Sequence, residues 1–264
     1  MKYKKEWFND DGFWRKFAPI IFDENRLAES AATVDGVTSL ARLKLYGNKK
    51  RQAKKPASQG GPFALDLCCG PGRIALEMAR RGYKVTGVDI CESYIMTARE
   101  AANKEAADIE YILKDVRSFK RKNAFDIAVN LYNSFGYFED PRDDLLLLKN
   151  ACYSLKERGC LIIDVLGKEI AVRDYNEAEW FERAGYTVLT ENFPVDSWGS
   201  VRNRWVLLKD GKRWEKVFFQ RLYAASELRS LLINAGFSSV ELYGDWDESP
   251  YDDKARTLIA VGRK

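Results

Sequence analysis

The feature that most constrains the fold is an alternation of apolar runs and helical segments that starts at Phe63. Apolar runs that indicate buried strands lie at 63–67, 83–88, 109–113, 125–131 and 160–166. Segments with helical periodicity lie between them at 73–81, 92–104 and 141–155. Strands that alternate with helices pair in parallel through right-handed crossovers. This part of the chain therefore predicts an open α/β sheet.

The pattern changes after residue 166. Strand-like runs at 186–192, 201–208 and 213–223 follow one another without helices, and Asp210-Gly211 is a hairpin turn signal. A helix at 226–235, ended by Gly236, and strands at 239–243 and 257–261 complete the chain. The sequence thus predicts a β-rich insertion between the fifth strand and the last helix.

The N-terminal part is expected to be helical. An unusually aromatic helix spans 6–17, and Asp23 can cap a second helix that runs to about residue 45. A basic linker, GNKKRQAKKPASQGGP, follows. The expected division is an N-terminal helical cap, the linker, the cofactor-binding core, the β insertion as acceptor-site cover, and the C-terminal part of the core, at 1–46, 47–62, 63–184, 185–223 and 224–264.

Composition excludes several kinds of chemistry. The 264 residues include no histidine, which rules out catalytic triads or dyads that need one and any histidine-ligated metal site. The five cysteines are odd in number and lack C-x-x-C spacing, so we expect no disulfide framework or metal, and a cytoplasmic protein. Neither a secretory signal nor an apolar run of the roughly 20 residues that cross a bilayer is seen.

The strand-to-helix turn DLCCGPGR, residues 66–73, carries the expected chemistry. Its two glycines let a ligand approach the backbone closely, and the following helix presents free N–H groups. Open α/β sheets bind nucleotides at such a first crossover. A G-x-G also marks many ordinary turns, so the turn alone indicates no more than a close backbone approach.

Two further acids end the next two strands. Asp89 lies nineteen residues after Gly70, and Asp115 lies twenty-six residues after Asp89. The first can accept both hydroxyls of a ribose, and the second can accept from the amine of an adenine. An acid at a strand end is often a helix cap, but three acids in order at successive strand ends favour an adenosine-type cofactor.

NAD is the nearest alternative cofactor. Its G-x-G-x-x-G pattern falls on Cys68, Gly70 and Arg73, so two of the three glycines are missing. Asp66 would also lie close to the pyrophosphate dianion, which is unfavourable. A sulfonium cofactor with an amino-acid tail has no such conflict.

The segments LDLCCGPGR, VTGVDI, ILKDVRSF and FDIAVNLYNSFGYF resemble, in this order, the motifs of class I S-adenosylmethionine-dependent methyltransferases. The chain after residue 201 and the N-terminal FWRKFAPIIF resemble a subgroup often assigned to small-molecule methyltransferases. In that subgroup an antiparallel insertion after the fifth strand helps to cover the acceptor site. The resemblance implies a Rossmann-like, doubly wound, mostly parallel seven-stranded sheet with an antiparallel last strand.

The resemblance also implies roles for the motif residues. The turn backbone cradles the methionine part of the cofactor, Asp66 orients the turn or the amino group, Asp89 binds the ribose, and Asp115 meets the adenine. The expected cofactor-binding residues are Asp66, Cys68, Gly70, Gly72, Arg73, Asp89, Ile90, Asp115, Val116, Asn130 and Leu131. Cys68 departs from the family, which usually has glycine there, so its backbone must suit a residue with a Cβ.

The acceptor pocket is expected over residues 131–138, beneath the N-terminal aromatic residues and the β insertion. The expected catalytic residues are Tyr132, Asn133, Arg204 and Tyr223, with Tyr137, Trp198, Arg221 and Tyr251 as further candidates. Aromatic residues on alternating strands usually pack a core, and strand arginines are usually solvated or paired. Methyl transfer from a sulfonium requires alignment more than a base, so the missing histidine is no obstacle.

The expected function is methyl transfer from S-adenosylmethionine to a nitrogen or oxygen of a small molecule, with S-adenosylhomocysteine as product, by a monomer or homodimer. One alternative is an RNA or protein acceptor guided by Lys49, Lys50, Arg51, Lys54 and Lys55. The net charge of +4 is too small to indicate nucleic acid by itself, and no aromatic residues are interleaved with the basic run. The other alternative is a non-catalytic cofactor-binding module.

Overall fold

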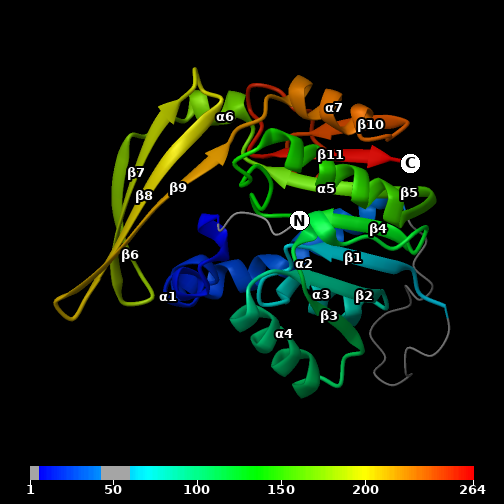
Figure 1. Cartoon of the computed structure of the whole chain (residues 1–264), viewed down its shortest axis with the longest axis horizontal. Helices are drawn as coiled ribbons and strands as arrows, with labels where there is room; N and C mark the ends of the chain where they lie inside the picture. Colours follow the sequence, from blue (N-terminus) through cyan, green and yellow to red (C-terminus); the bar gives the residue numbers. More distant parts are fainter. Residues whose placement is uncertain (1–5, 43–59) are drawn as a thin grey trace.

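The computed structural model describes residues 6–42 and 60–264, in which two β-sheets organise the chain (Figure 1). The first sheet has seven strands in the order β10-β11-β5-β4-β1-β2-β3. Its strands are β1 (Phe63–Leu67), β2 (Lys84–Asp89), β3 (Ile109–Leu113), β4 (Phe125–Asn130), β5 (Leu155–Val165), β10 (Ser239–Tyr243) and β11 (Leu258–Arg263). Strands β1 to β5 pair in parallel, and β11 is antiparallel to both of its neighbours.

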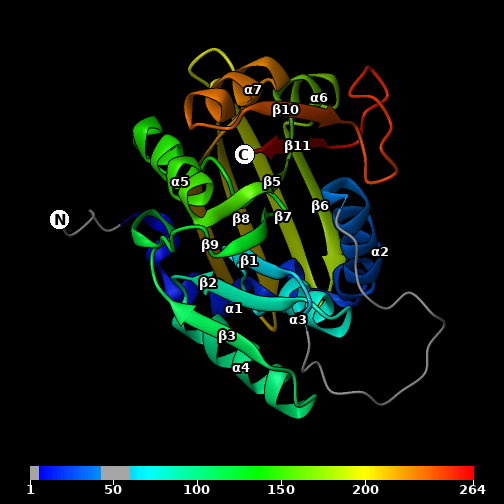
Figure 2. The same ribbon diagram turned by 90° about the vertical axis from the view of Figure 1, so that its right-hand side faces the viewer.

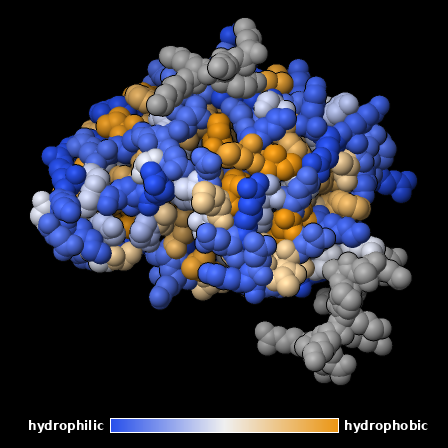
Figure 3. Space-filling model, turned by 60° about the horizontal axis from the view of Figure 1, so that its bottom comes forward, coloured by the Kyte–Doolittle hydropathy of each residue, from blue (hydrophilic) through white to orange (hydrophobic). Residues whose placement is uncertain are grey.

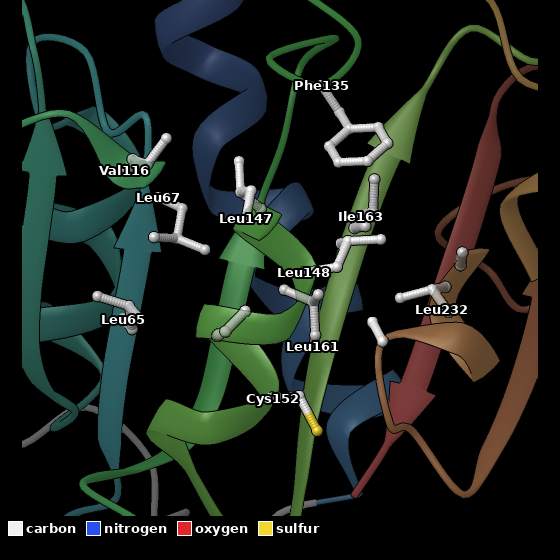
Figure 4. Close-up of a cluster of buried hydrophobic side chains, with 14 of the residues drawn as sticks. Leu65, Leu67, Val116, Phe135, Leu147, Leu148, Cys152, Leu161, Ile163 and Leu232 are labelled. Carbon is white, nitrogen blue, oxygen red and sulfur yellow. The ribbon is translucent and has the colours of Figure 1, made fainter. Parts of the chain in front are cut away.

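Helices cover both faces of this sheet (Figure 2). The helices of the described residues are α1 (Asp11–Ile21), α2 (Glu24–Ala41), α3 (Arg73–Arg80), α4 (Glu92–Lys104), α5 (Pro141–Ser154), α6 (Lys168–Arg173) and α7 (Ala225–Asn234), with 3-10 turns η1 (Trp7–Asn9) and η2 (Val116–Ser118). One apolar core joins the sheet to α2, α3 and α4. A second joins it to α5 and α7, where Leu147, Leu161 and Leu232 interlock (Figure 4).

The chain begins the first sheet at its centre. From β1 it winds outward through β2 to β3, and it then returns to add β4 on the other side of β1. The winding direction therefore reverses between β1 and β4. Ligands of open α/β sheets bind in the crevice at such a reversal, outside the carboxyl ends of the strands.

The second sheet is antiparallel, in the order β6-β7-β8-β9. Its strands are β6 (Ala178–Arg183), β7 (Tyr186–Val195), β8 (Ser200–Lys209) and β9 (Lys212–Arg221). Its inner face packs on α1 through Phe13, Phe17 and Ile20, which meet Val188 and Leu207. The hydroxyl of Tyr94 on α4 in turn donates to the backbone oxygen of Trp14 at 3.0 Å, so α1 joins the second sheet to the core domain.

The sequence-based fold class is confirmed, with local corrections. The N-terminal helix expected at 6–17 is instead η1 and α1, because Asp10 ends the first turn and caps α1 by accepting from Phe13 N at 3.1 Å. Asp23 caps α2 as expected, at 3.0 Å from Arg26 N, but α2 ends at Ala41 rather than near residue 45. The basic residues 49–55 lie outside the described residues.

Two strand boundaries also differ from expectation. Strand β5 starts at Leu155 rather than 160, because a bulge of polar residues separates its first pair with β4 from the rest. The second sheet starts at Ala178, before the expected 185, because β6 is a largely exposed edge strand whose charged residues hide the strand pattern.

On the face shown in Figure 3, polar side chains cover most of the area, and apolar side chains gather near its centre. Large exposed apolar residues occur on several elements, among them Met96, Leu113 and Trp180. Scattered exposed apolar side chains are normal for folded proteins. In the described part of the chain no helix is both long and apolar enough to cross a membrane.

Gly72, in the loop before α3, is closely packed, and this packing should affect stability. Gly72 and Gly82 both have positive φ, +81° and +89°, but a Cβ on Gly72 would lie 2.5 Å from Tyr111 Oη and 2.8 Å from Ala98 Cβ, whereas Gly82 has open space. Backbone strain costs roughly 1–2 kcal/mol at both sites, and overpacking adds roughly 1–3 kcal/mol at Gly72 alone. In urea unfolding, Gly72→Ala should lose clearly more stability than the matched control Gly82→Ala. Equal losses would contradict this packing.

Candidate active site at the carboxyl edge of the sheet

Two cavities adjoin at the carboxyl ends of the parallel strands. The smaller, of about 100 Å³, lies at the ends of β1, β2 and β3 and is closed by Phe8, Trp14 and Phe22 from the N-terminal segment. The larger, of about 900 Å³, lies between the ends of β1, β4 and β5, the N-terminal helices and the inner face of the second sheet. Both cavities therefore lie at the edge of the sheet where the winding direction reverses.

The turn after β1 has a left-handed backbone at Cys68, Gly70 and Gly72, with φ of +59°, +53° and +81°. Cys69 N donates to Val88 O at 3.1 Å, which ties the turn to β2. Cys68 therefore occupies the conformation that glycine favours, at a cost of roughly 1–2 kcal/mol. A cysteine in place of the glycine that is usual in the family thus leaves the backbone strained at this position, and such strain is often found at functional sites.

Asp66, at the end of β1, is a buried carboxylate without a full set of partners. It is 3% exposed and lines the larger cavity. Its Oδ2 has no hydrogen-bond partner among the described residues. Burial raises the pKa of this carboxyl to about 7, with Arg73 acting in the opposite direction. A buried acceptor without a donor is costly, so a ligand that brings a donor or a positive charge would be favoured here.

Asp89, at the end of β2, holds the turn and faces the smaller cavity. Its Oδ2 accepts from Gly70 N and its Oδ1 from Cys91 N, both at 2.8 Å. Burial raises the pKa of this carboxyl, and these hydrogen bonds act against the shift. A carboxylate has about four acceptor positions, so two remain for a ligand.

Asp115 has a different partner from the one the sequence suggests. Its carboxylate lines the smaller cavity, but Nε, Nη2 and the backbone N of Arg117 all donate to it at 2.6–3.1 Å. These three donors leave about one of its four acceptor positions, so the contact of its carboxylate with an adenine amine stays a prediction. Arg117 also pairs with Glu6 at 2.7 Å and Asp143 at 2.8 Å.

The Arg117 cluster joins the N-terminal segment to the smaller cavity. The arginine side chain is 1% exposed and lies 4.5 Å from the ring of Phe138. Burial lowers its pKa, but the carboxylates of Asp115 and Asp143 outweigh this and raise it, so the guanidinium stays charged. Because Glu6 belongs to the segment that carries Phe8 over the smaller cavity, this ion pair fixes the cover in place.

Tyr132 and Asn133, two of the expected catalytic residues, line the larger cavity. Both have a left-handed backbone, with φ of +57° and +60°. Asp164 at the end of β5 holds this strained loop, because its Oδ2 accepts from Tyr132 N at 3.2 Å and its backbone oxygen from Asn133 N at 3.1 Å. The Tyr132 ring lies against the Arg73 guanidinium at 3.6 Å.

Arg204, the third expected catalytic residue, points away from the site. Its guanidinium pairs with Glu191 and Glu215, both at 2.7 Å, on the outer face of the second sheet. Side chains alternate along a strand, and here Asn203 and Trp205 point into the cavity instead. The structure therefore does not bring Arg204 to either cavity, and nothing in its surroundings supports the predicted catalytic role.

Tyr223, the fourth, is also misplaced by the sequence-based prediction. Its hydroxyl donates to Asp144 Oδ2 at 2.7 Å, and Arg221 pairs with the same buried carboxylate on α5. This cluster fastens the end of the second sheet to the core and lines neither cavity. Trp198 and Tyr251 line neither cavity as well, whereas Tyr137 lines both.

The remaining expected cofactor-binding residues differ in which cavity they line. Ile90 and Val116 line the smaller cavity, and Arg73 and Leu131 line the larger. Gly72 lines neither and serves as N-cap of α3. Asn130 is fully buried and donates to Leu67 O at 3.1 Å, so it supports the turn from behind instead of facing a cavity.

Several cavity residues were missed by sequence reasoning. They are Arg26, Glu29 and Thr33 on α2, Asp164 on β5, Trp205, Phe218 and Gln220 on the second sheet, and Asp245, Trp246, Arg256 and Thr257 near the C-terminus. Asp164 carried a usable signal, because it is an acid at a strand end like Asp66 and Asp89. The others depend on how distant segments fold over the sheet.

Known proteins resemble this chain over most of its length. The family model described as a methyltransferase domain matches residues 64–159. A putative methyltransferase of Geobacillus sp. strain WCH70 is 26% identical over 225 residues, which cover 80% of this chain and 89% of that protein.

Solved structures match the fold. The CcbJ methyltransferase from Streptomyces caelestis has a TM-score of 0.76 at 16% identity, covering 99% of both chains. CalS10 from Micromonospora echinaspora, an amino pentose methyltransferase with S-adenosylmethionine bound, has a TM-score of 0.64 at 15% identity, covering 100% of both chains.

Replacing Asp89 tests the geometry of the smaller cavity. In Asp89→Asn the amide nitrogen cannot accept, so one of the bonds to Gly70 N and Cys91 N is lost together with the charge. Hydrogen bonds to charged groups are worth roughly 1.5–3 kcal/mol, so calorimetry should find S-adenosylhomocysteine bound about 10–100-fold more weakly. Asp126→Asn, at the opposite edge of the sheet, is the control. Equal affinities in both variants would refute this role.

Proposed function

The chain is an S-adenosylmethionine-dependent methyltransferase with a Rossmann-like fold, and we propose that it methylates a nitrogen or oxygen of a small molecule. The observation that carries this proposal is the larger cavity, of about 900 Å³, which is enclosed by protein on several sides. Pockets for small molecules typically measure roughly 300–1,000 Å³. CalS10, whose described acceptor is an amino pentose, supports the same reading.

The residues present fit the cofactor. Asp66 Oδ2, buried and without a partner, can accept from the amino group of the methionine part. Gly70 has a φ of +53°, a backbone conformation that favours glycine, and the absence of a Cβ lets a ligand approach this turn closely. The two remaining acceptor positions of Asp89 suit the ribose hydroxyls. Ile90 and Val116 offer an apolar wall for the adenine.

The place of reaction is proposed from the residues that line both cavities. These are Trp14, Phe22, Cys68, Gly70, Ser134 and Tyr137. When bound, the cofactor supplies a methyl group on a positively charged sulfur, open to displacement in line by an acceptor lone pair. The chain's residues hold the acceptor at this junction and exclude water. Such alignment contributes on the order of 7–11 kcal/mol.

The direct test supplies S-adenosylmethionine with a panel of small amines and alcohols, in parallel with total RNA and a protein mixture, and measures S-adenosylhomocysteine formed. Turnover of small molecules with little on polymers supports the proposal. Methylation confined to RNA or protein, and lost on deletion of residues 49–55, would establish the alternative acceptor class. Cofactor binding without turnover of any acceptor would favour a non-catalytic module.

Two neighbours on β8 test which side of the second sheet faces the acceptor. Trp205 lines the cavity, whereas Arg204 pairs with acids on the outer face. Trp205→Ala should lower kcat/KM for the acceptor about 10–100-fold, as expected when a large aromatic contact is removed. Its affinity for S-adenosylhomocysteine should stay within about twofold.

Arg204→Ala is the matched control, and both its kinetic parameters and its cofactor affinity should stay near those of the parent protein. If Arg204→Ala lowers kcat/KM as strongly as Trp205→Ala, the second sheet does not present its inner face to the acceptor.

A further inference from the structure

The charged side chains that line the larger cavity differ in whether they form ion pairs. They belong to Arg26, Glu29, Asp66, Arg73, Asp164, Arg183, Asp245, Asp247 and Arg256. Three of the four arginines have an acidic partner: Arg26 pairs with Glu29 at 3.0 Å, Arg183 with Asp23 at 3.2 Å, and Arg256 with Asp245.

The fourth arginine is held by neutral groups. Arg73 donates to Arg26 O at 2.9 Å and Ser30 Oγ at 3.0 Å, and its guanidinium lies over the Tyr132 ring. Each of the four arginines therefore has at least one partner among the described residues, and Arg73 is the one whose hydrogen-bond partners are all neutral.

Two of the carboxylates are buried, Asp66 at 3% exposure and Asp164 at 8%. Within residues 6–42 and 60–264 neither of them forms an ion pair. Burying a carboxylate without a cation is costly, and the cost falls when a ligand supplies one. The amino group of the cofactor would supply the cation for Asp66, which leaves Asp164.

Asp164 is held in one orientation. Its Oδ2 accepts from Tyr132 N at 3.2 Å, and its Oδ1 accepts from the Thr257 hydroxyl. Two neutral donors leave about two acceptor positions on this carboxylate. Burial raises its pKa, while these hydrogen bonds and the more distant Arg26 and Arg73 lower it, so burial dominates.

Aromatic rings face the same cavity. Trp7, Trp14, Tyr137, Trp205 and Phe218 line it, and Trp7 stacks on Phe218 with ring centroids 4.7 Å apart. Aromatic faces attract cations, by roughly 2 kcal/mol or more where water is excluded. A buried carboxylate and aromatic faces that line one cavity are the chemistry that recognises an ammonium group.

We propose that the acceptor is an amine, that its ammonium form binds Asp164, and that this nitrogen receives the methyl group. The proposal rests on the small-molecule function above and narrows it to nitrogen. The ammonium first gives one proton to the Asp164 carboxylate, which frees the nitrogen lone pair. The N–C bond then forms as the S–C bond breaks, leaving a methylated ammonium and a neutral thioether. The proton on Asp164 returns to solvent.

The first experiment uses the unaltered protein. Amines and alcohols that share a carbon skeleton are supplied in pairs with S-adenosylmethionine, and S-adenosylhomocysteine formation is measured. The expected result is turnover of amines, with their matched alcohols at least about 100-fold poorer, because an alcohol brings no charge to Asp164. Turnover of alcohols in place of amines would overturn the inference while leaving the small-molecule function standing.

The second experiment removes the charge alone. Asp164→Asn keeps the side-chain shape and should reduce kcat/KM for the amine about 100-fold, while affinity for S-adenosylhomocysteine stays within about twofold. Asp164→Glu should restore part of the activity. Asp108→Asn, the same change at an exposed site before β3, should act like the parent protein. Amine turnover by Asp164→Asn at the parent rate would overturn the proposal.

Discussion

The site depends on a constraint of the fold: parallel strands bring their carboxyl ends to one edge, and here acids end β1, β2 and β5. Asp66, Asp89 and Asp164 are all buried at that edge. Burial raises the pKa of each carboxyl. Asp89 offsets this cost with two backbone N–H groups, whereas Asp66 and Asp164 form no ion pair within the described chain and have only the more distant Arg73 and Arg26 as neighbouring cations. The edge is therefore built for ligands that bring positive charge.

The N-terminal segment completes both cavities. Trp14 and Phe22 line the smaller and the larger one, and Phe8 covers the smaller. The Glu6–Arg117 ion pair fixes this cover to the same cluster that occupies the carboxylate of Asp115. The same N-terminal segment thus covers both cavities, which suits a reaction that needs water excluded from the place where they meet.

The sequence was sufficient to predict the features of the site that depend on local sequence pattern alone. The turn at residues 66–73 and Asp89 lie where strand ends and spacing put them, and Cys68 adopts the backbone that its position requires. Arg204 and Tyr223 lie outside both cavities, which the sequence did not reveal because the face that a strand residue occupies depends on register in the second sheet, whose edge strand β6 was missed. Arg117 pairs directly with Asp115, two residues before it, and its burial beneath the N-terminal segment comes with an ion pair to Glu6, more than a hundred residues away, which no local pattern reveals.

The central claim is that the buried carboxylates at this edge bind positively charged groups of the ligands. Proton release on cofactor binding tests this claim most directly. Burial raises the pKa of Asp66 to about 7 in the free protein, so this carboxyl carries a proton in part of the molecules near neutral pH. An ammonium group bound beside it lowers that pKa and expels the proton. Calorimetric titration with S-adenosylhomocysteine at pH 7, in two buffers of different ionisation enthalpy, should show net release of protons on binding. The release should be lost in Asp66→Asn. No proton release by the parent protein, or the same release by both, would contradict the account.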